Sequence, residues 1–374
     1  MRPDHAPRQY RLHTRIKHVF LWPFKALRHY TKRGWRQRLV VFITAFLVLW
    51  VGSMYGIAQW YINSNEHKPL VIGASFIPAY AESLGLDPED TLDAMLDDLG
   101  IRHLRLVSYW NQLEPAQNQY DFSMLDWQFE KAEAAGAKIT LSLGLRQPRW
   151  PECHTPAWAL ALPSGNEAGT WQSELLDYIE EVVNRYKSSP ALDSYQLENE
   201  YFLRGFGICT DFSRERLVNE YNLVKRLDPY HKLIIARSNN ALGMPIGEPT
   251  PDEFGISIYK RVWDANLTKR YLEYPFPAWF YGFVAGGQKL LTGKDMIIHE
   301  LQAEAWPPGG NIPTSTLEEQ NESFNADRFR KRVEFGKATG MREIYLWGAE
   351  YWYYRLQKLN DPSLWNVARD TFKD

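Results

Sequence analysis

The sequence lacks the signatures of several common enzyme classes. The five histidines beyond residue 62 show no metal-ligand spacing, and no HExxH helix motif occurs. There is no Gly-x-Ser-x-Gly turn, which argues against a serine hydrolase, and no glycine-rich phosphate loop. We therefore expect chemistry that uses neither a metal nor another cofactor.

Charge is missing from one long stretch. From Leu39 to Ile62 the sequence runs for 24 residues without a charged side chain, which is enough to cross a hydrocarbon core of ~30 Å. A cleaved signal peptide would have a shorter apolar run and a small-residue cleavage site, and neither is evident. We predict a transmembrane helix over residues 39–62, with a buried core helix as the alternative.

The flanking charges predict the orientation of this helix. The net charge is −2, but residues 1–38 carry eleven Lys and Arg against one acidic residue, Asp4. The positive-inside rule predicts a cytoplasmic segment 1–38, a single pass through the cell membrane, and an extracytoplasmic remainder that begins with a linker at residues 63–69. Such a basic segment beside a membrane span is more typical of contact with lipid than with nucleic acid. We expect the bilayer as a partner of residues 39–62, and no nucleic acid.

Only two cysteines occur, Cys153 and Cys209. Both lie in the part of the chain predicted to be extracytoplasmic, where an oxidising environment permits a disulfide. Both also fall in predicted loops that follow consecutive strands, so they are expected near each other. A disulfide and two free buried thiols both remain open.

After the linker, short apolar runs alternate with longer amphipathic ones. The apolar runs predict eight strands, at Leu70–Phe76, His103–Ser108, Lys138–Gly144, Leu192–Asn199, Lys232–Ala236, Glu253–Tyr259, Met296–Leu301 and Glu343–Trp347. The amphipathic runs predict helices from Asp87 to Gly100 and at Ser123–Ala135, Trp171–Lys187, Arg214–Leu227, Ala278–Leu291, Asn325–Thr339 and Pro362–Phe372.

This alternation predicts an α/β fold, a (β/α)₈ TIM barrel over residues 70–374 that follows the single N-terminal transmembrane helix. Eight units over 305 residues give about 38 residues per unit, which suits a barrel with elaborated loops. An open doubly wound sheet is the alternative. It would favour a glycine-rich phosphate turn after the first strand, and the segment that begins at Gly73 is not one.

Polar and aromatic residues gather where the predicted strands end, which is the active-site face of such a barrel. Strands two, three, four, six, seven and eight run respectively into Tyr109-Trp110, Arg146-Gln147-Pro148, Glu198-Asn199-Glu200, Tyr259-Lys260, His299-Glu300 and Trp347. Acids, amides and aromatics on one rim suit glycoside hydrolysis, which needs two carboxyl groups that flank the anomeric carbon.

Three segments resemble known glycosidases. Residues 195–201 (YQLENEY) are similar to the Gln-x-Glu/Asp-Asn-Glu-Tyr signature of family 35 and family 42 β-galactosidases, and Asn199-Glu200 is the pair that ends strand four across clan A of retaining glycosidases. Residues 110–126 resemble the stretch after strand two in family 42 enzymes, and residues 297–302 resemble the strand-seven nucleophile segment of the clan. Small cellulase-like members of family 5 are also similar, and we expect a barrel without the extra domains of full-length β-galactosidases.

The resemblance implies two catalytic carboxyl groups. Glu200 would be the acid/base and Glu300 the nucleophile, while Asn199 would bind the sugar 2-hydroxyl or its equivalent. Glu304, which lies four residues after Glu300, is the rival nucleophile. Glu300 is preferred because it directly follows the apolar run of strand seven.

Further residues are expected to bind substrate or support the carboxyl groups. Tyr259 would hydrogen-bond the nucleophile, Arg105 would help keep it ionised, and Trp347 would form the floor under the sugar. Glu198 would share a face with Glu200 in a regular strand, as a substrate ligand, as a neighbour that raises the pKa of Glu200, or as half of a structural pair.

Aromatic residues near the rim are expected to stack on sugar rings. Trp110, Trp150 and Trp306 are the candidates, and ordinary packing is the alternative for each of them.

The sequence thus predicts a membrane-anchored retaining β-glycosidase that hydrolyses an extracytoplasmic oligo- or polysaccharide with two carboxyl groups. Two other functions remain open. One is a non-catalytic carbohydrate-binding or envelope protein on the same barrel, and the other is a transglycosylase.

Overall fold

The structure, a computed structural model, describes residues 34–203, 205–209, 211–238, 247–265 and 267–373. It divides into two compact units, one that ends at Ile57 and one that begins at Ala58. Most of the predicted cytoplasmic segment 1–38 lies outside the described residues.

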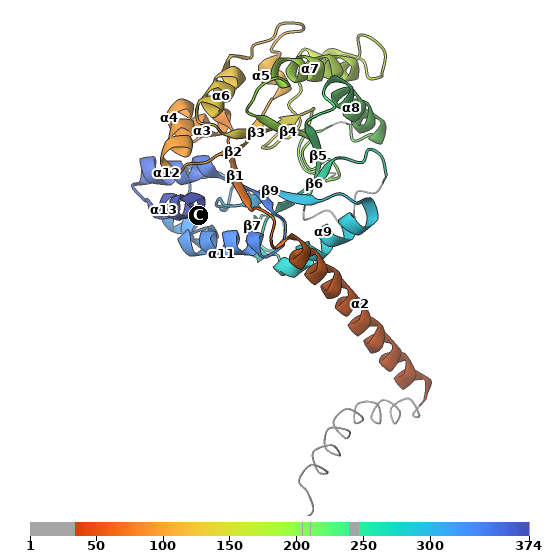
Figure 1. The fold of residues 1–374 in the computed structure, drawn as a ribbon. Coiled ribbons are helices and arrows are strands. Elements are labelled where there is room, and N and C mark those ends of the chain that lie inside the picture. Colours follow the sequence, from red (N-terminus) through yellow and green to blue (C-terminus); the bar gives the residue numbers. More distant parts are fainter. Residues whose placement is uncertain (1–33, 204, 210, 239–246, 266, 374) are drawn as a thin grey trace, which may run out of the picture. The chain divides into compact units, whose positions relative to one another are not determined.

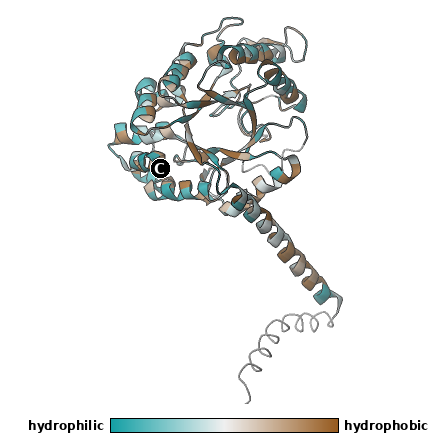
Figure 2. Cartoon of the chain, in the orientation of Figure 1, coloured by the Kyte–Doolittle hydropathy of each residue, from teal (hydrophilic) through white to brown (hydrophobic). Residues whose placement is uncertain are grey.

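The first unit consists of most of helix α2 (Trp35–Asn65). This helix is long and apolar enough to cross a membrane, with a mean hydropathy of 2.1 over its most apolar window, although a signal sequence would pass the same test. Figure 2 shows hydrophobic residues along its length. The helix extends beyond both limits predicted from the sequence, 39 and 62.

The last turns of α2 belong to the second unit, so the predicted linker does not begin at residue 63. Ala58, Tyr61 and Asn65 are buried, and the hydroxyl of Tyr61 donates to the carbonyl of Met296. Ile62 packs so closely on Gly340 that a Cβ there would lie 2.8 Å from the Cα of Ile62. Residues 58–65 are therefore part of the folded domain.

This packing predicts how a shortened chain should behave. We expect a chain that begins at Glu66 to be less stable than one that begins at Ala58, by about 2–4 kcal/mol, because it loses the buried side chain of Tyr61 and the contacts of Ile62. Thermal unfolding of the two chains measures the difference. Equal melting temperatures would show that the final turns of α2 contribute nothing.

The second unit confirms the predicted barrel (Figure 1). Its described residues form one closed ring of eight parallel strands in the order β1-β10-β9-β6-β5-β4-β3-β2. The strands are β1 (Val71–Ser75), β2 (His103–Val107), β3 (Lys138–Leu143), β4 (Leu192–Leu197), β5 (Lys232–Ser238), β6 (Glu253–Ile258), β9 (Met296–Gln302) and β10 (Glu343–Trp347). The ring closes where Val71 pairs with Glu343. All carboxyl ends therefore meet on one face.

Helices surround the ring, and side-chain caps fix where several of them begin. The main ones are α4 (Pro88–Asp93) with a following π-helical turn at Ala94–Asp98, α6 (Ser123–Ala134), α7 (Trp171–Tyr186), α8 (Arg214–Leu227), α9 (Ala278–Thr292), α11 (Ala326–Lys337) and α13 (Ser363–Lys373). Asp87, Thr170, Ser213 and Asn325 each accept a backbone N–H in the first turn of their helix. These match the predicted helices to within a few residues.

Several short elements were not predicted from the sequence. They are α3 (Pro78–Ser83), α5 (Trp110–Leu113), a 3₁₀ turn at Ala159–Ala161, the hairpin of β7 (Arg261–Asp264) and β8 (Arg270–Glu273), α10 (Leu317–Ser323) and α12 (Ala349–Leu359). Apart from α12, they are too short to show a clear apolar period. All of them follow the carboxyl ends of strands and so elaborate the active-site face.

Cys153 and Cys209 form a disulfide. It joins the loop after β3 to the loop after β4, across 56 residues of sequence. We expect Cys153→Ser to lower the free energy of unfolding by about 4 kcal/mol, because a loop of this length is no longer closed in the unfolded chain. Chemical denaturation in the presence and absence of a reductant measures this. If a reductant lowers the stability of the native chain to that of the variant, and leaves the variant unchanged, the loss of the disulfide is the cause.

Candidate active site

Glu300, near the end of β9, is held by two partners from other parts of the ring, Arg105 on β2 and Tyr259 directly after β6. Its Oε1 accepts from Nη1 of Arg105 at 2.8 Å and forms an ion pair with it, and its Oε2 accepts from the hydroxyl of Tyr259 at 2.8 Å. The Glu300 side chain is buried. Both contacts agree with the roles expected for Arg105 and Tyr259. They fix the orientation of the carboxylate at the centre of the rim.

Glu200 follows β4 and is buried near Glu300. Burial, and then the negative charge of Glu300, raise the pKa of Glu200 to about 7, against smaller lowering effects from Ser257, Arg146 and Ser238. Its Oε1 is buried without a hydrogen-bond partner among the described residues. A buried, protonated carboxyl with a vacant oxygen is what a general acid requires before the substrate arrives.

Arg105 connects the end of β4 with Glu300 on β9. Its Nε donates to Oε1 of Gln196 at 2.7 Å, and its Nη2 donates to Oδ1 of Asn199 at 3.0 Å. The same guanidinium holds Glu300, so one buried cation orients Asn199 and the carboxylate together. Asn199 is thus part of the Glu300 cluster.

The chain after β4 departs from the geometry that the sequence suggested. The strand ends at Leu197 rather than Asn199. Glu198 and Glu200 have φ values of 57° and 45°, a left-handed conformation that costs a non-glycine residue about 1–2 kcal/mol. The expectation that these two residues share one face of a regular strand is therefore wrong. Such strain is often found where side chains are held for function.

Glu198 has partners other than Glu300. Its Oε1 accepts from Nη1 of Arg216 at 2.7 Å and from the amide of Leu145 at 2.7 Å, and its Oε2 accepts from the amide of Arg146 at 3.1 Å. Both oxygens are in use, and the residue has no exposed surface. These contacts favour a structural ion pair over substrate binding.

Glu304, the rival of Glu300, belongs to a second cluster with Trp347. Arg149 donates to both oxygens of Glu304, at 2.9 and 2.8 Å, and Tyr80 donates to Oε2 at 3.0 Å. The indole of Trp347 donates to Oε1 at 2.8 Å, and the Arg149 guanidinium lies 4.3 Å from the Trp347 ring centroid. Glu304 thus belongs to this second cluster, whereas the negative charge of Glu300 acts on Glu200 and raises its pKa, which favours Glu300 as the nucleophile. Trp347 ends β10 and is only 5% exposed, so its role as a sugar platform stays a prediction.

The three tryptophans proposed for stacking differ in their exposure. Trp110 is fully buried, and its indole donates to Glu114, so it packs in the core and has no face for a sugar. Trp306 is half-buried and meets Tyr259 edge to face at 5.7 Å. Trp150 is 64% exposed. The stacking role expected for Trp110 is therefore wrong, and Trp306 and Trp150 remain available.

Two residues near the carboxyl pair were not predicted as site residues. Arg146 donates from Nε to the backbone carbonyl of Asn199 at 2.6 Å, and Glu152 accepts from Nδ2 of Asn199 at 3.3 Å. The sequence placed Arg146 on the rim but gave it no role. Glu152 lies nine residues beyond the end of β3, in an irregular loop, where no periodic signal exists.

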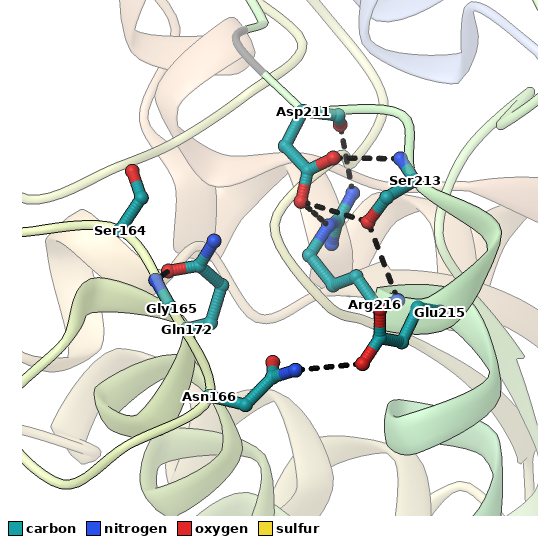
Figure 3. A pocket seen from close by; sticks show the side chains of 8 residues that line it. All are labelled: Ser164, Gly165, Asn166, Gln172, Asp211, Ser213, Glu215 and Arg216. Atoms are coloured by element: carbon teal, nitrogen blue, oxygen red, sulfur yellow. Dashed lines mark hydrogen bonds and ion pairs between the residues drawn. The ribbon is translucent and has the colours of Figure 1, made fainter.

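A separate polar cavity of about 300 Å³ lies beside the start of α8 (Figure 3). It is lined by Ser164, Gly165, Asn166, Gln172, Asp211, Ser213, Glu215 and Arg216. Several lining groups bind one another: Asn166 donates to Glu215 at 2.8 Å, and Gly165 donates to Gln172 at 2.8 Å. The cavity contains neither Glu200 nor Glu300.

The closed barrel has a carboxyl group directly after its fourth strand and another on its seventh, the arrangement that the sequence led us to expect. The β-galactosidase model of glycoside hydrolase family 42 matches residues 89–162, which include β2 and the turn of Trp110 and Glu114. The resemblance to such enzymes that the sequence indicated is therefore confirmed for this segment.

Individual relatives extend the likeness. A β-galactosidase of Halorubrum lacusprofundi is 25% identical over 154 residues, which are 36% of this chain and 22% of that protein. A solved β-galactosidase structure from the same species has a TM-score of 0.53 at 15% identity, and covers 81% of this chain and 58% of its own. Xylanase 10B of Thermotoga maritima has a TM-score of 0.54 at 15% identity, and the match covers 86% of this chain and 98% of the xylanase. The structural matches show the fold alone.

Proposed function

We propose that this protein is a membrane-anchored retaining β-glycosidase that acts on an extracytoplasmic saccharide. The observation that carries the proposal is the contrast between two neighbouring carboxyl groups. Glu300 is held in an ion pair with Arg105, while burial and the charge of Glu300 keep Glu200 protonated up to about pH 7. Opposite protonation states on a neighbouring pair assign the nucleophile and the acid.

The reaction then follows from these positions. Glu300 attacks the anomeric carbon as Glu200 gives its proton to the departing glycosidic oxygen, and a glycosyl-enzyme ester forms. Glu200, now ionised, removes a proton from water, and the water oxygen attacks the anomeric carbon and releases Glu300. Arg105 and Tyr259 hold Glu300 in place through both steps, and Trp347 lies beneath the sugar.

The anchor is proposed from the apolar helix. Because residues 58–65 pack on the barrel, Leu39–Ile57 remain for the bilayer, and their 19 residues span about 28 Å at the helical rise. The disulfide supports an oxidising location for the barrel, and the basic segment 1–38 supports a cytoplasmic N-terminus.

The test is turnover by the full chain in detergent on a panel of aryl β-glycosides, with the first-formed product followed by proton NMR. We expect hydrolysis of at least one sugar with initial release of the β-anomer. Initial release of the α-anomer would contradict the retaining mechanism. A folded protein that turns over no sugar would favour a binding protein, and transfer of sugar to an added acceptor in preference to water would identify a transglycosylase.

A further inference from the structure

A third carboxyl group lies in the site, and the two-carboxyl mechanism does not use it. Glu152 belongs to the loop after β3 and is 4% exposed. Its Oε2 accepts from Nδ2 of Asn199 at 3.3 Å, and Asn199 is joined through Arg105 to Glu300. Glu152 therefore contacts Asn199, the residue that is expected to bind the sugar next to its anomeric carbon.

The surrounding backbone holds Glu152 in this position. A Cβ at Gly207 would lie 2.6 Å from the Cβ of Glu152, and Gly207 has a φ of 84°, so only glycine allows the loop after β4 to come this close. On one side of Glu152, the carbonyl of Pro151 accepts from the amide of Ile208 at 2.9 Å. On the other side, Cys153 forms the disulfide. The position of Glu152 is therefore fixed by the backbone of both loops.

The charge of Glu152 is poorly compensated. Its cationic partner is Arg146, whose Nη2 lies 3.4 Å from Oε2 without the geometry of a hydrogen bond. Burial raises the pKa of Glu152 to about 8, and the nearby carboxyl groups of Glu200 and Glu300 act in the same direction against a lowering by Arg146. A cation brought into the site would relieve this excess of acidic groups.

The two oxygens of Glu152 differ in their contacts. Oε2 has both of the contacts above, while no hydrogen bond or ion pair joins Oε1 to a described residue. Asn199, which would bind the sugar 2-hydroxyl or its equivalent, is the neighbour of this carboxyl. The group that meets Oε1 should therefore be the substituent on the sugar carbon next to the anomeric centre.

We propose that Glu152 is a specificity residue that binds an amino group at this position, so that the preferred substrate is a β-glycoside of a 2-amino-2-deoxy sugar. The ammonium group would donate to Oε1 of Glu152. A sugar with a hydroxyl group there meets an uncharged acid and brings no positive charge to this cluster of acidic groups. This inference rests on the proposed glycosidase site, but its binding test does not require turnover.

Calorimetric titration of the full chain in detergent tests the proposal at pH 6.5. The ligands are methyl β-glucosaminide against methyl β-glucoside, and methyl β-galactosaminide against methyl β-galactoside. In at least one pair we expect the amine to bind about tenfold tighter or more, the effect of one charge-assisted hydrogen bond. Binding of the ammonium should also release up to one proton from Glu152, measured by repeating the titration in buffers of different ionisation enthalpy.

Glu152→Gln is the matched variant, since it keeps the size of the side chain and removes its charge. We expect it to lose both the amine preference and the proton release, whereas a purely structural role would lower the affinity for both members of a pair equally. Titration of the native chain is also decisive without the variant. The proposal is overturned if neither pair shows an amine preference, or if an amine preference appears without proton release.

Turnover separates this proposal from the wider one. Hydrolysis of hydroxyl-bearing aryl glycosides only, with no binding preference for amines, would refute the role of Glu152 and leave the glycosidase intact. A folded chain that binds the amines with proton release but hydrolyses nothing would refute the glycosidase and leave the role of Glu152.

Discussion

Glu300→Gly is expected to lower kcat for an activated aryl β-glycoside by roughly 10⁴-fold or more, because no covalent intermediate can form without the nucleophile. The cavity left by the side chain would admit azide beside the anomeric carbon. Added azide should then restore turnover and yield the α-glycosyl azide, which NMR identifies.

Glu304→Gly is the matched control for this experiment, because Glu304 is a neighbouring buried acid. Its oxygens bind Arg149, Tyr80 and Trp347, so the substitution should weaken substrate binding at the Trp347 platform without creating a site for azide. Azide rescue of Glu304→Gly in place of Glu300→Gly would exchange the two assignments.

Glu200→Gln is expected to remove the alkaline limb of the pH profile. Glu200 must be protonated to act as an acid, and its pKa is raised to about 7, so kcat/KM of the native enzyme should fall about tenfold per pH unit above that value. The variant should lose about 10²–10⁴-fold in kcat/KM on substrates with poor leaving groups, because these depend most on proton donation. Dinitrophenyl glycosides should lose much less in the first step.

A second buried acid provides the control for the pH profile. Burial raises the pKa of Glu350 to about 7 as well, but its Oε1 accepts from the amide of Ile77, outside the Glu300 cluster. Glu350→Gln should keep the alkaline limb. A limb that survives in Glu200→Gln and disappears in Glu350→Gln would contradict the assignment of the acid.

The barrel could be predicted from the sequence because its strands are short, continuous apolar runs. Strand β9, for example, begins with the apolar run Met296–Ile298 and is buried along all seven residues. Once the strands are parallel, their carboxyl ends share one face. The convergence of Arg105, Asn199, Tyr259 and Glu300 follows from this rule without further information.

The side-chain directions in irregular loops could not be predicted. Glu198 and Glu200 have left-handed backbones, so the alternation of a strand does not apply to them. Arg149 and Glu152 have φ values of 78° and 72°, and it is this turn that places one on Trp347 and the other on Asn199. For Trp110, a position at the rim did not distinguish stacking from packing, because its hydrogen bond to Glu114 depends on the fold of the loop after β2.

The disulfide gives the proposed enzyme a dependence on the order of events in its biosynthesis. It joins the loop that carries Glu152 to the loop that follows Asn199 and Glu200, so both sides of the sugar site are tied together only after oxidation. A newly made chain in a reducing cytosol would lack this tie. We expect its hydrolytic activity to mature only after export, which would spare saccharides and glycosylated precursors inside the cell, and comparison of protein synthesised under reducing and oxidising conditions would measure that delay.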